Sequence, residues 1–450
     1  MLVDLGDALA WLDRHQNLER MLADRSRAIP DPARMAQLMA VLGDPQAAAP
    51  VIHVTGTNGK TSTARAIAQL LSAKGLSVGT FTSPHLESIN ERITAHGQAI
   101  DDDTLADLLS DVADVEGLLG PDLRPTWFEI LAAAAFRFFA DRPVDVAVVE
   151  VGLGGRWDAT NVVDATVAVV TNVGLDHTEL LGPSRSDIAG EKAGIVKERS
   201  ILVLGERDPG LRAIFEREDP AELWLAGRDY GCSRNELAVG GRVLDVRTPG
   251  ATYTGLWLDL HGRHQADNFA TALAATEAFF AAPVEEPLVR EAAATVRSPG
   301  RMEVVARQPL VILDGAKNPD GAAAAASTLS EDFGEARSRI LVVGMLGGKD
   351  PEEMLSALDA GRARLVVACL APSPRALPAG EVAAAAAAVG AQAEVVESVP
   401  DALRAAMDRA TAEDLILVTG SLYVVGAARA AFAGRVPLIR YSAGPWPAPS

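Results

Sequence analysis

The chain contains few cysteines and no long apolar run. Its two cysteines, Cys232 and Cys369, are far apart in the sequence and fit neither a metal-binding spacing nor a disulfide pattern. No run reaches the roughly 18 apolar residues of a membrane span. Residues 1–20 carry acids where a signal peptide has a basic start and an apolar core. We therefore expect a cytoplasmic protein with no membrane partner.

Basic residues are outnumbered by acidic ones, and the formal net charge is −19 at pH 7. This charge argues against nucleic acid as a partner, because binding to nucleic acid depends on neutralising phosphates. Anionic small molecules are compatible with it if a pocket concentrates arginine and lysine locally. A chain of 450 residues is long for a single core, so we expect two domains.

Lysine is the scarcest charged residue type, since only six of the 41 Lys and Arg residues are lysines. The chain uses arginine where a surface positive charge suffices, so a lysine indicates a place that needs a compact amine. Lys74, near the end of a predicted helix, has an ordinary surface role in this interpretation. The six are Lys60, Lys74, Lys192, Lys197, Lys317 and Lys349.

Residues 51–62, with the sequence VIHVTGTNGKTS, predict a phosphate-binding loop. An apolar strand ends at Thr55, and a helix with an Ala/Leu-rich pattern begins at Lys60. Backbone N–H groups at a helix N-terminus face an anion, and the helix dipole adds partial positive charge. The residues predicted to form this site are Gly56, Thr57, Asn58, Gly59, Lys60, Thr61 and Ser62.

Within this loop, Lys60 would contact the terminal phosphates, and Thr61 or Ser62 would place a hydroxyl group on Mg²⁺. The match to the common phosphate-loop motif is incomplete, because the first glycine of that motif falls at Val54. The alternative is a glycine-rich turn that only caps a helix. The Lys-Thr-Ser sequence directly after Gly59 favours the phosphate site.

Polar residues also follow two other predicted strands. Glu150 comes after the apolar run 144–149, and His177 follows the run 165–171. In a sheet parallel to the strand at 51–55, both side chains would lie at the same edge as the loop, where a Mg²⁺-directed carboxylate is expected. A single histidine is more often structural than a metal ligand, but this position favours a ligand role.

Three other residues have a structural alternative. Thr126 and Glu129 fit a capping box before a helix at 127–140, which could be their whole role. Lys192 lies in an otherwise small and apolar helical segment, where it could be an exposed lysine paired with a neighbouring glutamate.

The chain divides near Pro299-Gly300. We predict a phosphate-loop domain at 1–297 with a parallel-dominated sheet and a small added β portion at about 200–260. A smaller Rossmann-like α/β domain is predicted at 298–450. In that domain, apolar runs alternate with Ala-rich helical stretches, as in a mainly parallel sheet. The runs are 310–314, 340–344, 364–369, 392–396 and 415–419.

Together these stretches resemble the folylpolyglutamate synthase family of the Mur ligase superfamily, including its bifunctional dihydrofolate synthase members. The resemblance extends over nearly the whole chain. It departs from the family's usual DGAHNP motif at Lys317, which replaces histidine and puts a proton-transfer role there in doubt. Thr61 stands where many members have glycine. The matching motifs are GTNGKTS (56–62), TSPHL (82–86), ERI (91–93), TWFE (126–129), EVGLGGR (150–156), DATN (158–161), GLDHT (174–178), EKAGI (191–195), HQADN (264–268), PGR (299–301), DGAKNP (314–319) and GSLY (420–423).

The resemblance implies binding of ATP and Mg²⁺. Ser83, Glu150 and His177 would ligate one Mg²⁺, and Thr61 or Ser62 a second. Lys192 would be carbamylated by CO₂ and help to hold Mg²⁺, a modification that an amine allows and arginine does not. A monovalent cation such as K⁺ is also expected. The implied nucleotide contacts beyond the loop are Asn268, Arg301, Asp314 and Lys317, and the implied catalytic residues are Lys60, Glu150, His177, Lys192 and Arg301.

The family's reaction implies dihydropteroate or reduced folates, L-glutamate and ATP as substrates. A substrate carboxylate attacks the γ-phosphorus of ATP, and the amine of L-glutamate then displaces phosphate from the acyl phosphate. This chemistry needs neutralisation of anions and close positioning, and closure of two domains would exclude water. A monomer is expected. The residues implied to flank the pteroate or folate are Arg92, Thr126, Phe128, Asp158 and Ala159.

Three alternatives remain at this point. The enzyme could have only the polyglutamating activity. It could be a cell-wall Mur ligase, although the phosphate loop begins only about 50 residues into the chain and leaves no room for the extra N-terminal domain usual in those enzymes. It could be a nucleotide-binding regulatory module without catalysis, although such a module predicts gaps in the metal-ligand set.

Overall fold

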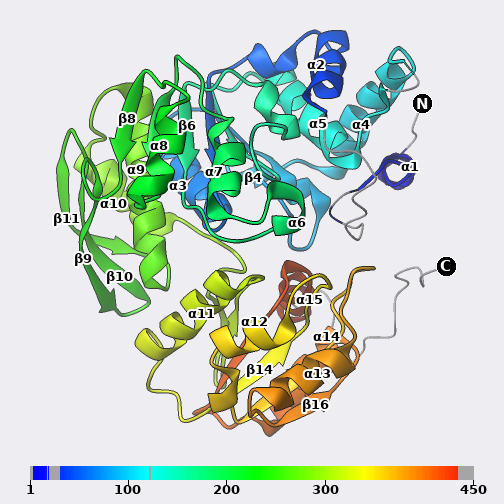
Figure 1. Ribbon diagram of the computed structural model, residues 1–450, viewed down its shortest axis with the longest axis vertical. Helices are drawn as coiled ribbons and strands as arrows, with labels where there is room; N and C mark the ends of the chain where they lie inside the picture. The colour runs from blue at the N-terminus through cyan, green and yellow to red at the C-terminus, as the bar shows by residue number, and fades with distance from the viewer. Residues whose placement is uncertain (1–3, 18, 20–30, 121–122, 434–450) are drawn as a thin grey trace.

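The computed structural model describes residues 4–17, 19, 31–120 and 123–433. It contains two α/β bodies, which occupy the upper and lower halves of Figure 1. The upper body runs from α1 (Leu5–Leu12) to α10 (Glu286–Thr295), and the lower body from β12 (Glu303–Arg307) to α15 (Leu422–Phe432). None of the helices in these described ranges is long and apolar enough to cross a membrane.

The upper body is built around an eight-stranded sheet with the order β4-β3-β2-β5-β1-β6-β7-β8. Neighbouring strands from β2 to β8 are parallel, and β3 is antiparallel to both of its neighbours. The strand before the phosphate loop, β1, thus lies between β5 and β6. The strands are β1 (Val51–Thr55), β2 (Val78–Phe81), β3 (Ile93–Ala95), β4 (Gln98–Ala99), β5 (Val146–Glu150), β6 (Val167–Val170), β7 (Ile201–Leu204) and β8 (Glu222–Leu225).

Helices cover both faces of this sheet, because its central strands are apolar on both sides. On the face formed by Ile52 and Val54 of β1, the core contains α3 (Lys60–Ala73), α9 (Arg263–Phe280) and α10. The opposite face packs against two helical groups. The helices of these groups are α1, α2 (Pro32–Val41), α4 (Asp102–Glu116) and α5 (Trp127–Asp141), and then α6 (Thr178–Leu181), α7 (Arg185–Ala193) and α8 (Pro209–Glu216).

A separate antiparallel sheet packs beside α9 and α10. It contains β9 (Gly231–Ala238), β10 (Gly241–Arg247) and β11 (Thr252–Leu258), and it contributes to the same core as α3. Within the range of about 200–260, where we predict short strands, β7 and β8 therefore extend the large sheet. The separate sheet begins at Gly231.

The lower body contains a six-stranded sheet with the order β12-β13-β17-β14-β15-β16. All neighbouring pairs are parallel except β12 with β13, which confirms the predicted parallel sheet. The five apolar runs correspond to β13–β17; β12, which is half-buried, lies outside them. The other strands and helices of the lower body are β13 (Leu310–Leu313), β14 (Arg339–Val343), β15 (Leu365–Ala368), β16 (Ala393–Val395), β17 (Leu415–Thr419), α11 (Pro319–Glu331), α12 (Pro351–Ala357), α13 (Ala379–Ala388) and α14 (Val399–Arg409).

The predicted capping box before α5 is confirmed. The Glu129 backbone N–H donates to the Thr126 hydroxyl, and the Thr126 N–H donates to the Glu129 carboxylate at 2.7 Å. Glu129 also accepts two hydrogen bonds of 2.8 Å from the Arg34 guanidinium. Glu129 therefore has a structural role in joining α5 to α2.

Candidate active site

The phosphate loop connects β1 to α3, as the sequence predicts. Gly56 and Gly59 have φ angles of 151° and 82°, in the region that favours glycine. A Cβ on Gly56 would lie 1.8 Å from Thr171 Oγ1, and one on Gly59 would lie 2.4 Å from Asn268 Oδ1. The loop therefore requires glycine at both positions, for backbone conformation and for space.

Lys60 is the first residue of α3, and its side chain bends back over the loop. Its Nζ donates to the Gly56 carbonyl at 3.0 Å. Burial lowers the pKa of Lys60, while the carboxylates of Glu150 and Asp176 oppose this effect. The amine thus lies over the phosphate loop, whose backbone N–H groups can face an anion.

Glu150 ends β5 at the same edge of the sheet. Its carboxylate accepts hydrogen bonds of 3.0 Å from the Thr61 hydroxyl and of 3.2 Å from the Ser83 backbone N–H. The residue is 1% exposed. Burial raises the pKa of Glu150, and Lys60 opposes that rise. This places a carboxylate and a hydroxyl group together, and both are oxygen donors of the kind that Mg²⁺ prefers.

His177 follows β6, directly before α6, and its side chain faces the lower body. Its Nε2 is 3.4 Å from the Nζ of Lys317. Burial and then Lys317 lower the pKa of His177 to about 3, so the imidazole is neutral at physiological pH, the form that ligates metals. Among the described residues, no three His, Cys, Asp or Glu side chains form a metal-binding group by themselves. The predicted ligand set also uses hydroxyl groups and a modified lysine.

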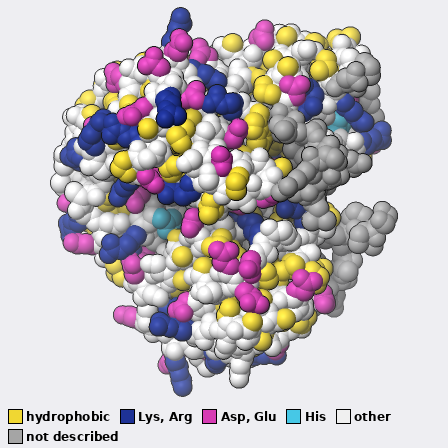
Figure 2. Space-filling view, viewed as in Figure 1, with side chains coloured by type: hydrophobic (Ala, Val, Ile, Leu, Met, Phe, Trp, Pro, Cys, Tyr) yellow, Lys and Arg dark blue, Asp and Glu magenta, His cyan; other side chains and the backbone are white. Residues whose placement is uncertain are grey.

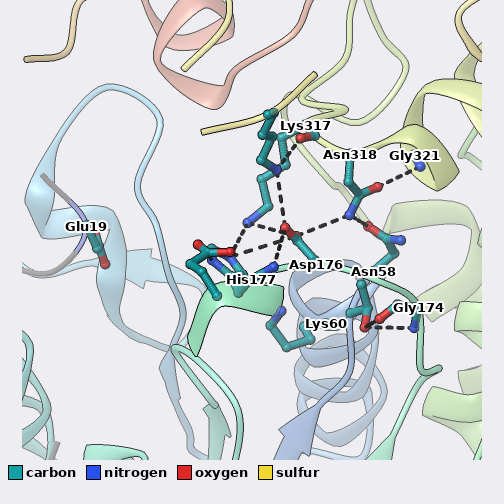
Figure 3. A network of polar contacts seen from close by, with 12 residues as sticks. Glu19, Asn58, Lys60, Gly174, Asp176, His177, Lys317, Asn318 and Gly321 are labelled. Carbon is teal, nitrogen blue, oxygen red and sulfur yellow. Dashed lines mark hydrogen bonds and ion pairs between the residues drawn. The ribbon is translucent and has the colours of Figure 1, made fainter. Parts of the chain in front are cut away.

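Asp176 joins the two bodies beside His177 (Figure 3). Its carboxylate lies 3.6 Å from Lys317 Nζ and 3.2 Å from Lys349 Nζ. Asn318 donates to it at 3.2 Å and to the Asn58 side-chain oxygen at 3.1 Å. Burial alone would raise the pKa of Asp176, but Lys317, His177 and Lys349 hold it below its usual range. This acid therefore balances the cationic groups of the site.

Lys192 lies near the end of α7 and is 3% exposed. Gly155 packs on its backbone so closely that a Cβ on the glycine would lie 3.0 Å from Lys192 Cα. Burial and the neighbouring charge of Lys60 lower the pKa of Lys192 well below its ordinary value. Lys192 is thus a buried amine. The alternative interpretation, an exposed lysine paired with a neighbouring glutamate, is wrong.

A cavity of about 690 Å³ lies between the two bodies. Its wall combines the phosphate loop and Glu150 of the upper body with residues of the lower body. Gly56, Arg92 and Lys192 are the predicted residues that do not line it. The predicted residues that do are Thr57, Asn58, Gly59, Lys60, Thr61, Ser62, Ser83, Thr126, Phe128, Glu150, Asp158, Ala159, His177, Asn268, Arg301, Asp314 and Lys317.

Arg92 lies behind the cavity wall, in contrast to the predicted substrate contact. It is 1% exposed, and its guanidinium donates to Glu19 at 2.9 and 2.7 Å and to His85 Nδ1 at 2.9 Å. The guanidinium also stacks 4.8 Å from the Trp127 ring. Glu19 itself lines the cavity. Arg92 therefore reaches the cavity only through the carboxylate that it holds.

One part of the cavity wall is apolar and aromatic. Phe128 lies against Gly152, where a Cβ would be 2.4 Å from the ring. Leu153, Trp157 and Ala159 line the same region, and Asp158 adds a carboxylate that is 4% exposed. Such a wall suits a flat heterocycle that presents some polar edge atoms.

The lower body contributes Arg301 and Asp314. The Asp314 carboxylate accepts from the backbone N–H groups of Met302 at 3.0 Å and Ala316 at 2.9 Å. Arg301 lies so close to Gly315 that a Cβ there would be 2.4 Å from its Nη1. Burial raises the pKa of Asp314, and Arg301 opposes the rise.

Sequence reasoning assigned no role to Asp176, Lys349 or Arg375. Lys349 and Arg375 line the cavity, and Asp176 lies 3.2 Å from Lys349 Nζ. The scarcity of lysine was a signal for Lys349. Arg375 donates to the Glu19 carbonyl at 3.3 Å, and its buried Nε has no hydrogen-bond partner among the described residues. Acidic and basic side chains are interspersed over the face in Figure 2, and the cavity wall likewise combines basic residues such as Lys349 and Arg375 with acids.

Comparison with known proteins gives consistent matches along the chain. Residues 54–276 match the Mur ligase middle domain, and residues 300–422 match the Mur ligase glutamate ligase domain. A relative from Mycobacterium tuberculosis named dihydrofolate synthase/folylpolyglutamate synthase is 39% identical, over 97% of this chain and 96% of the relative.

Solved structures give the same result. Folylpolyglutamate synthase of M. tuberculosis in complex with ADP has a TM-score of 0.88 at 38% identity, covering 95% of this chain and 98% of that one. Escherichia coli FolC in complex with DHPP and ADP has a TM-score of 0.86 at 32% identity, and the Yersinia pestis bifunctional enzyme with AMPPNP and a Mn ion 0.83 at 30%. Each covers 96% of this chain and 98% of its own.

Proposed function

Because the chain belongs to the folylpolyglutamate synthase/dihydrofolate synthase family of Mur ligases, we propose that it is an ATP-dependent ligase that adds L-glutamate to dihydropteroate and to folates. The observation that carries this proposal is the cavity between the two bodies. It joins the phosphate loop, the metal-directed oxygens at Glu150 and an aromatic wall in one space.

ATP would occupy the side of the cavity that contains the phosphate loop. Lys60 and the loop amides would hold the terminal phosphates, and Arg301 would approach them from the lower body. Asn268, Asp314 and Lys317 would complete the nucleotide contacts. The cations come from both bodies, so binding of ATP favours their approach.

The residues present fit Mg²⁺. Ser83, Glu150 and His177 would hold one ion, and Thr61 or Ser62 a second, because they offer oxygen donors and a neutral imidazole. Bound Mg²⁺ neutralises phosphate charge and orients the γ-phosphoryl group. We extend the proposal to carbamylation of Lys192, whose amine is buried and has a pKa lowered well below its ordinary value, and to a monovalent cation such as K⁺.

The pteroate or folate would lie against the aromatic wall, with Thr126, Phe128, Asp158 and Ala159 around it. Arg92 would act through Glu19, since the two side chains form a bidentate pair. The heterocycle would then be held against the upper body, and the carboxylate that reacts would point toward the phosphate loop.

The reaction follows from this placement. A carboxylate oxygen of the substrate attacks the γ-phosphorus of ATP, the bond to the ADP oxygen breaks, and an acyl phosphate forms. The amine nitrogen of L-glutamate attacks the acyl carbon, and phosphate leaves as the amine loses a proton. Lys60 and Arg301 stabilise the charge on the transferred group, and the closed cavity keeps water from the acyl phosphate.

We further propose that the functional domains are residues 1–297 and 298–450, and that the enzyme acts as a monomer in the cytoplasm. Support for the division comes from the element bounds, because α10 ends at Thr295 and β12, the first strand of the lower sheet, begins at Glu303. A hinge at this place would let the lower body move over ATP.

Phosphate release tests the proposed function. Purified protein is incubated with ATP, Mg²⁺ and L-glutamate, with dihydropteroate in one series and a reduced folate in the other. We expect glutamate-dependent release in both series and none after chelation of Mg²⁺. Release with the reduced folate alone would leave only the polyglutamating activity. Absence of release with both substrates would refute the proposal.

A further inference from the structure

A buried histidine on β1 has no part in the reaction described above. His53 is 0% exposed, and its Nε2 lies 2.8 Å from the hydroxyl oxygen of Thr160, which is also fully buried. Thr160 in turn donates to the Asp158 carboxylate at 2.5 Å. These three side chains form a chain of hydrogen bonds from the central strand to a carboxylate on the cavity wall.

The direction of the hydrogen bonds is fixed by the backbone around Asp158. The carboxylate also accepts from the N–H groups of Leu153 and Thr160, each at 2.9 Å, and backbone amides can only donate. The Thr160 hydroxyl has a single proton, which it gives to Asp158. Its oxygen therefore accepts from His53, and the imidazole carries its proton on Nε2.

The same face of β1 makes a second contact with the wall. The Thr55 hydroxyl, two residues beyond His53, donates to the Gly154 carbonyl at 2.8 Å. Successive side chains of a strand point to opposite faces, so His53 and Thr55 act on one side. Both bind the segment 152–160, which we call the wall loop, and β1 continues directly into the phosphate loop.

The wall loop fits tightly between its neighbours. Gly152 supports the Phe128 ring, and Gly155 packs on the backbone of Lys192. Asp158 links the two ends of the loop, because it accepts from Leu153 on one side and from Thr160 on the other. A small shift of Asp158 would therefore move the aromatic wall against which the proposed substrate lies.

An apolar residue at position 53 would avoid the cost of burying an imidazole. Burial lowers the pKa of His53 to about 3, so the ring is neutral at physiological pH and does not serve as a pH switch. Its Nδ1 has no hydrogen-bond partner among the described side chains and backbone groups. Because an apolar residue would avoid this cost, we infer that the hydrogen bond from the His53 Nε2–H to Thr160 has a role of its own.

We propose that His53 is a positioning residue for the pteridine-binding wall, which acts through Thr160 to hold Asp158 and the wall loop in place. This inference rests on the proposed function, because it assigns the wall to the pteridine group of the substrate. It predicts an effect on binding of dihydropteroate and none on binding of ATP.

The test compares KM values for three substrates in four single variants and in the double variant His53→Leu/Thr160→Val. His53→Leu and Thr160→Val remove the donor and the hydroxyl, while His53→Gln keeps an amide N–H near the position of Nε2. Ile52→Val is the matched control, since Ile52 is a buried neighbour on the opposite face of β1. Thermal unfolding of each variant is followed in parallel, together with equilibrium binding of dihydropteroate in the presence of ADP.

We expect His53→Leu and Thr160→Val each to raise the KM for dihydropteroate about ten-fold, the effect of one buried hydrogen bond. The KM values for ATP and L-glutamate should change less than about two-fold. The double variant should be no worse than the more impaired single variant, because both changes break one chain. His53→Gln should stay within about three-fold of the wild type, and Ile52→Val should affect only thermal stability.

Three outcomes would overturn the inference. The KM for ATP could rise as much as that for dihydropteroate, His53→Gln could be as impaired as His53→Leu, or His53→Leu could lower only the unfolding temperature, as Ile52→Val does. Failure of the proposed function looks different, since the wild type would then neither bind nor turn over dihydropteroate. If His53→Leu does not fold, Thr160→Val and a Thr160→Ser variant that keeps the hydroxyl decide the question.

Discussion

Gly426→Ala tests whether close contact between the two bodies is needed for activity. Gly426 lies inside α15, and a Cβ on it would be 2.0 Å from the Leu86 carbonyl oxygen of the upper body. Leu86 belongs to the segment that begins at Ser83, whose N–H donates to Glu150. The substitution therefore acts on the segment that joins the lower body to the proposed metal site.

Two effects of opposite sign decide the outcome. Alanine is favoured over glycine inside a helix by about 1 kcal/mol, which stabilises α15 in any arrangement of the bodies. The clash between the new Cβ and the Leu86 carbonyl exists only when the two bodies are arranged as in this structure, which we call the closed arrangement. Ordinary contact needs about 3.4 Å, so the carbonyl oxygen has to move by about 1.4 Å. Overpacking of this kind costs about 1–3 kcal/mol, and it involves backbone atoms that cannot change rotamer.

We expect Gly426→Ala to keep or raise the unfolding temperature and to lower kcat/KM by about 5- to 150-fold, as a cost of about 1–3 kcal/mol implies. The assay is phosphate release with ATP, L-glutamate and a reduced folate, with thermal unfolding measured on the same sample. Gly380→Ala is the control, because Gly380 lies in α13 of the same body with no atom within 4 Å of the new Cβ. Activity of Gly426→Ala within two-fold of this control would refute the reasoning.

Three other changes give separate predictions. Lys192→Arg should lose most activity, because arginine cannot form a carbamate, and a crystal structure of the wild type should show CO₂ on Nζ; an active arginine variant would contradict the role. Arg242→Met should lower the free energy of unfolding by about 3 kcal/mol, since it leaves the buried Asp332 carboxylate without the guanidinium that lies 2.6 Å away. The exposed pair Arg263–Glu331 nearby is the control, and Arg263→Met should cost less than about 1 kcal/mol in chemical denaturation. Burial alone would raise the pKa of Asp332, but the neighbouring His261 and hydrogen bonds from Gly262 and Arg242 hold it below its usual range. The contribution of Asp332 to stability should therefore be complete above the ordinary pKa of about 3.9 and be lost as the pH falls through the lower native value. Asp332→Asn should remove this part of the acid dependence in urea titrations at several pH values.

The parallel architecture was predictable because each central strand is a short apolar run followed by a turn. Glu150 could be placed at the edge of the sheet for the same reason, since its position depends only on strand direction. The capping box of Thr126 and Glu129 was predictable from a four-residue pattern. In each case the signal is local in the sequence, and tertiary packing has only to preserve it.

Contacts between distant segments were not predictable from the sequence. Arg92 pairs with Glu19, 73 residues away, and Lys349 donates to Asp176, 173 residues away. Nothing in the neighbouring residues distinguishes these partners from other acids in a chain with 60 of them. The edge strand β12 could not be predicted for another reason. It is half-buried, and a half-buried strand lacks a continuous apolar run.

The cations of the site explain why an acid lies at position 176. Lys317 and Lys349 come from the lower body and both lie within 3.6 Å of Asp176. Without that carboxylate, the two amines would repel each other and Lys60 across the boundary between the bodies. Asp176 thus keeps the lysines close together before an anion enters.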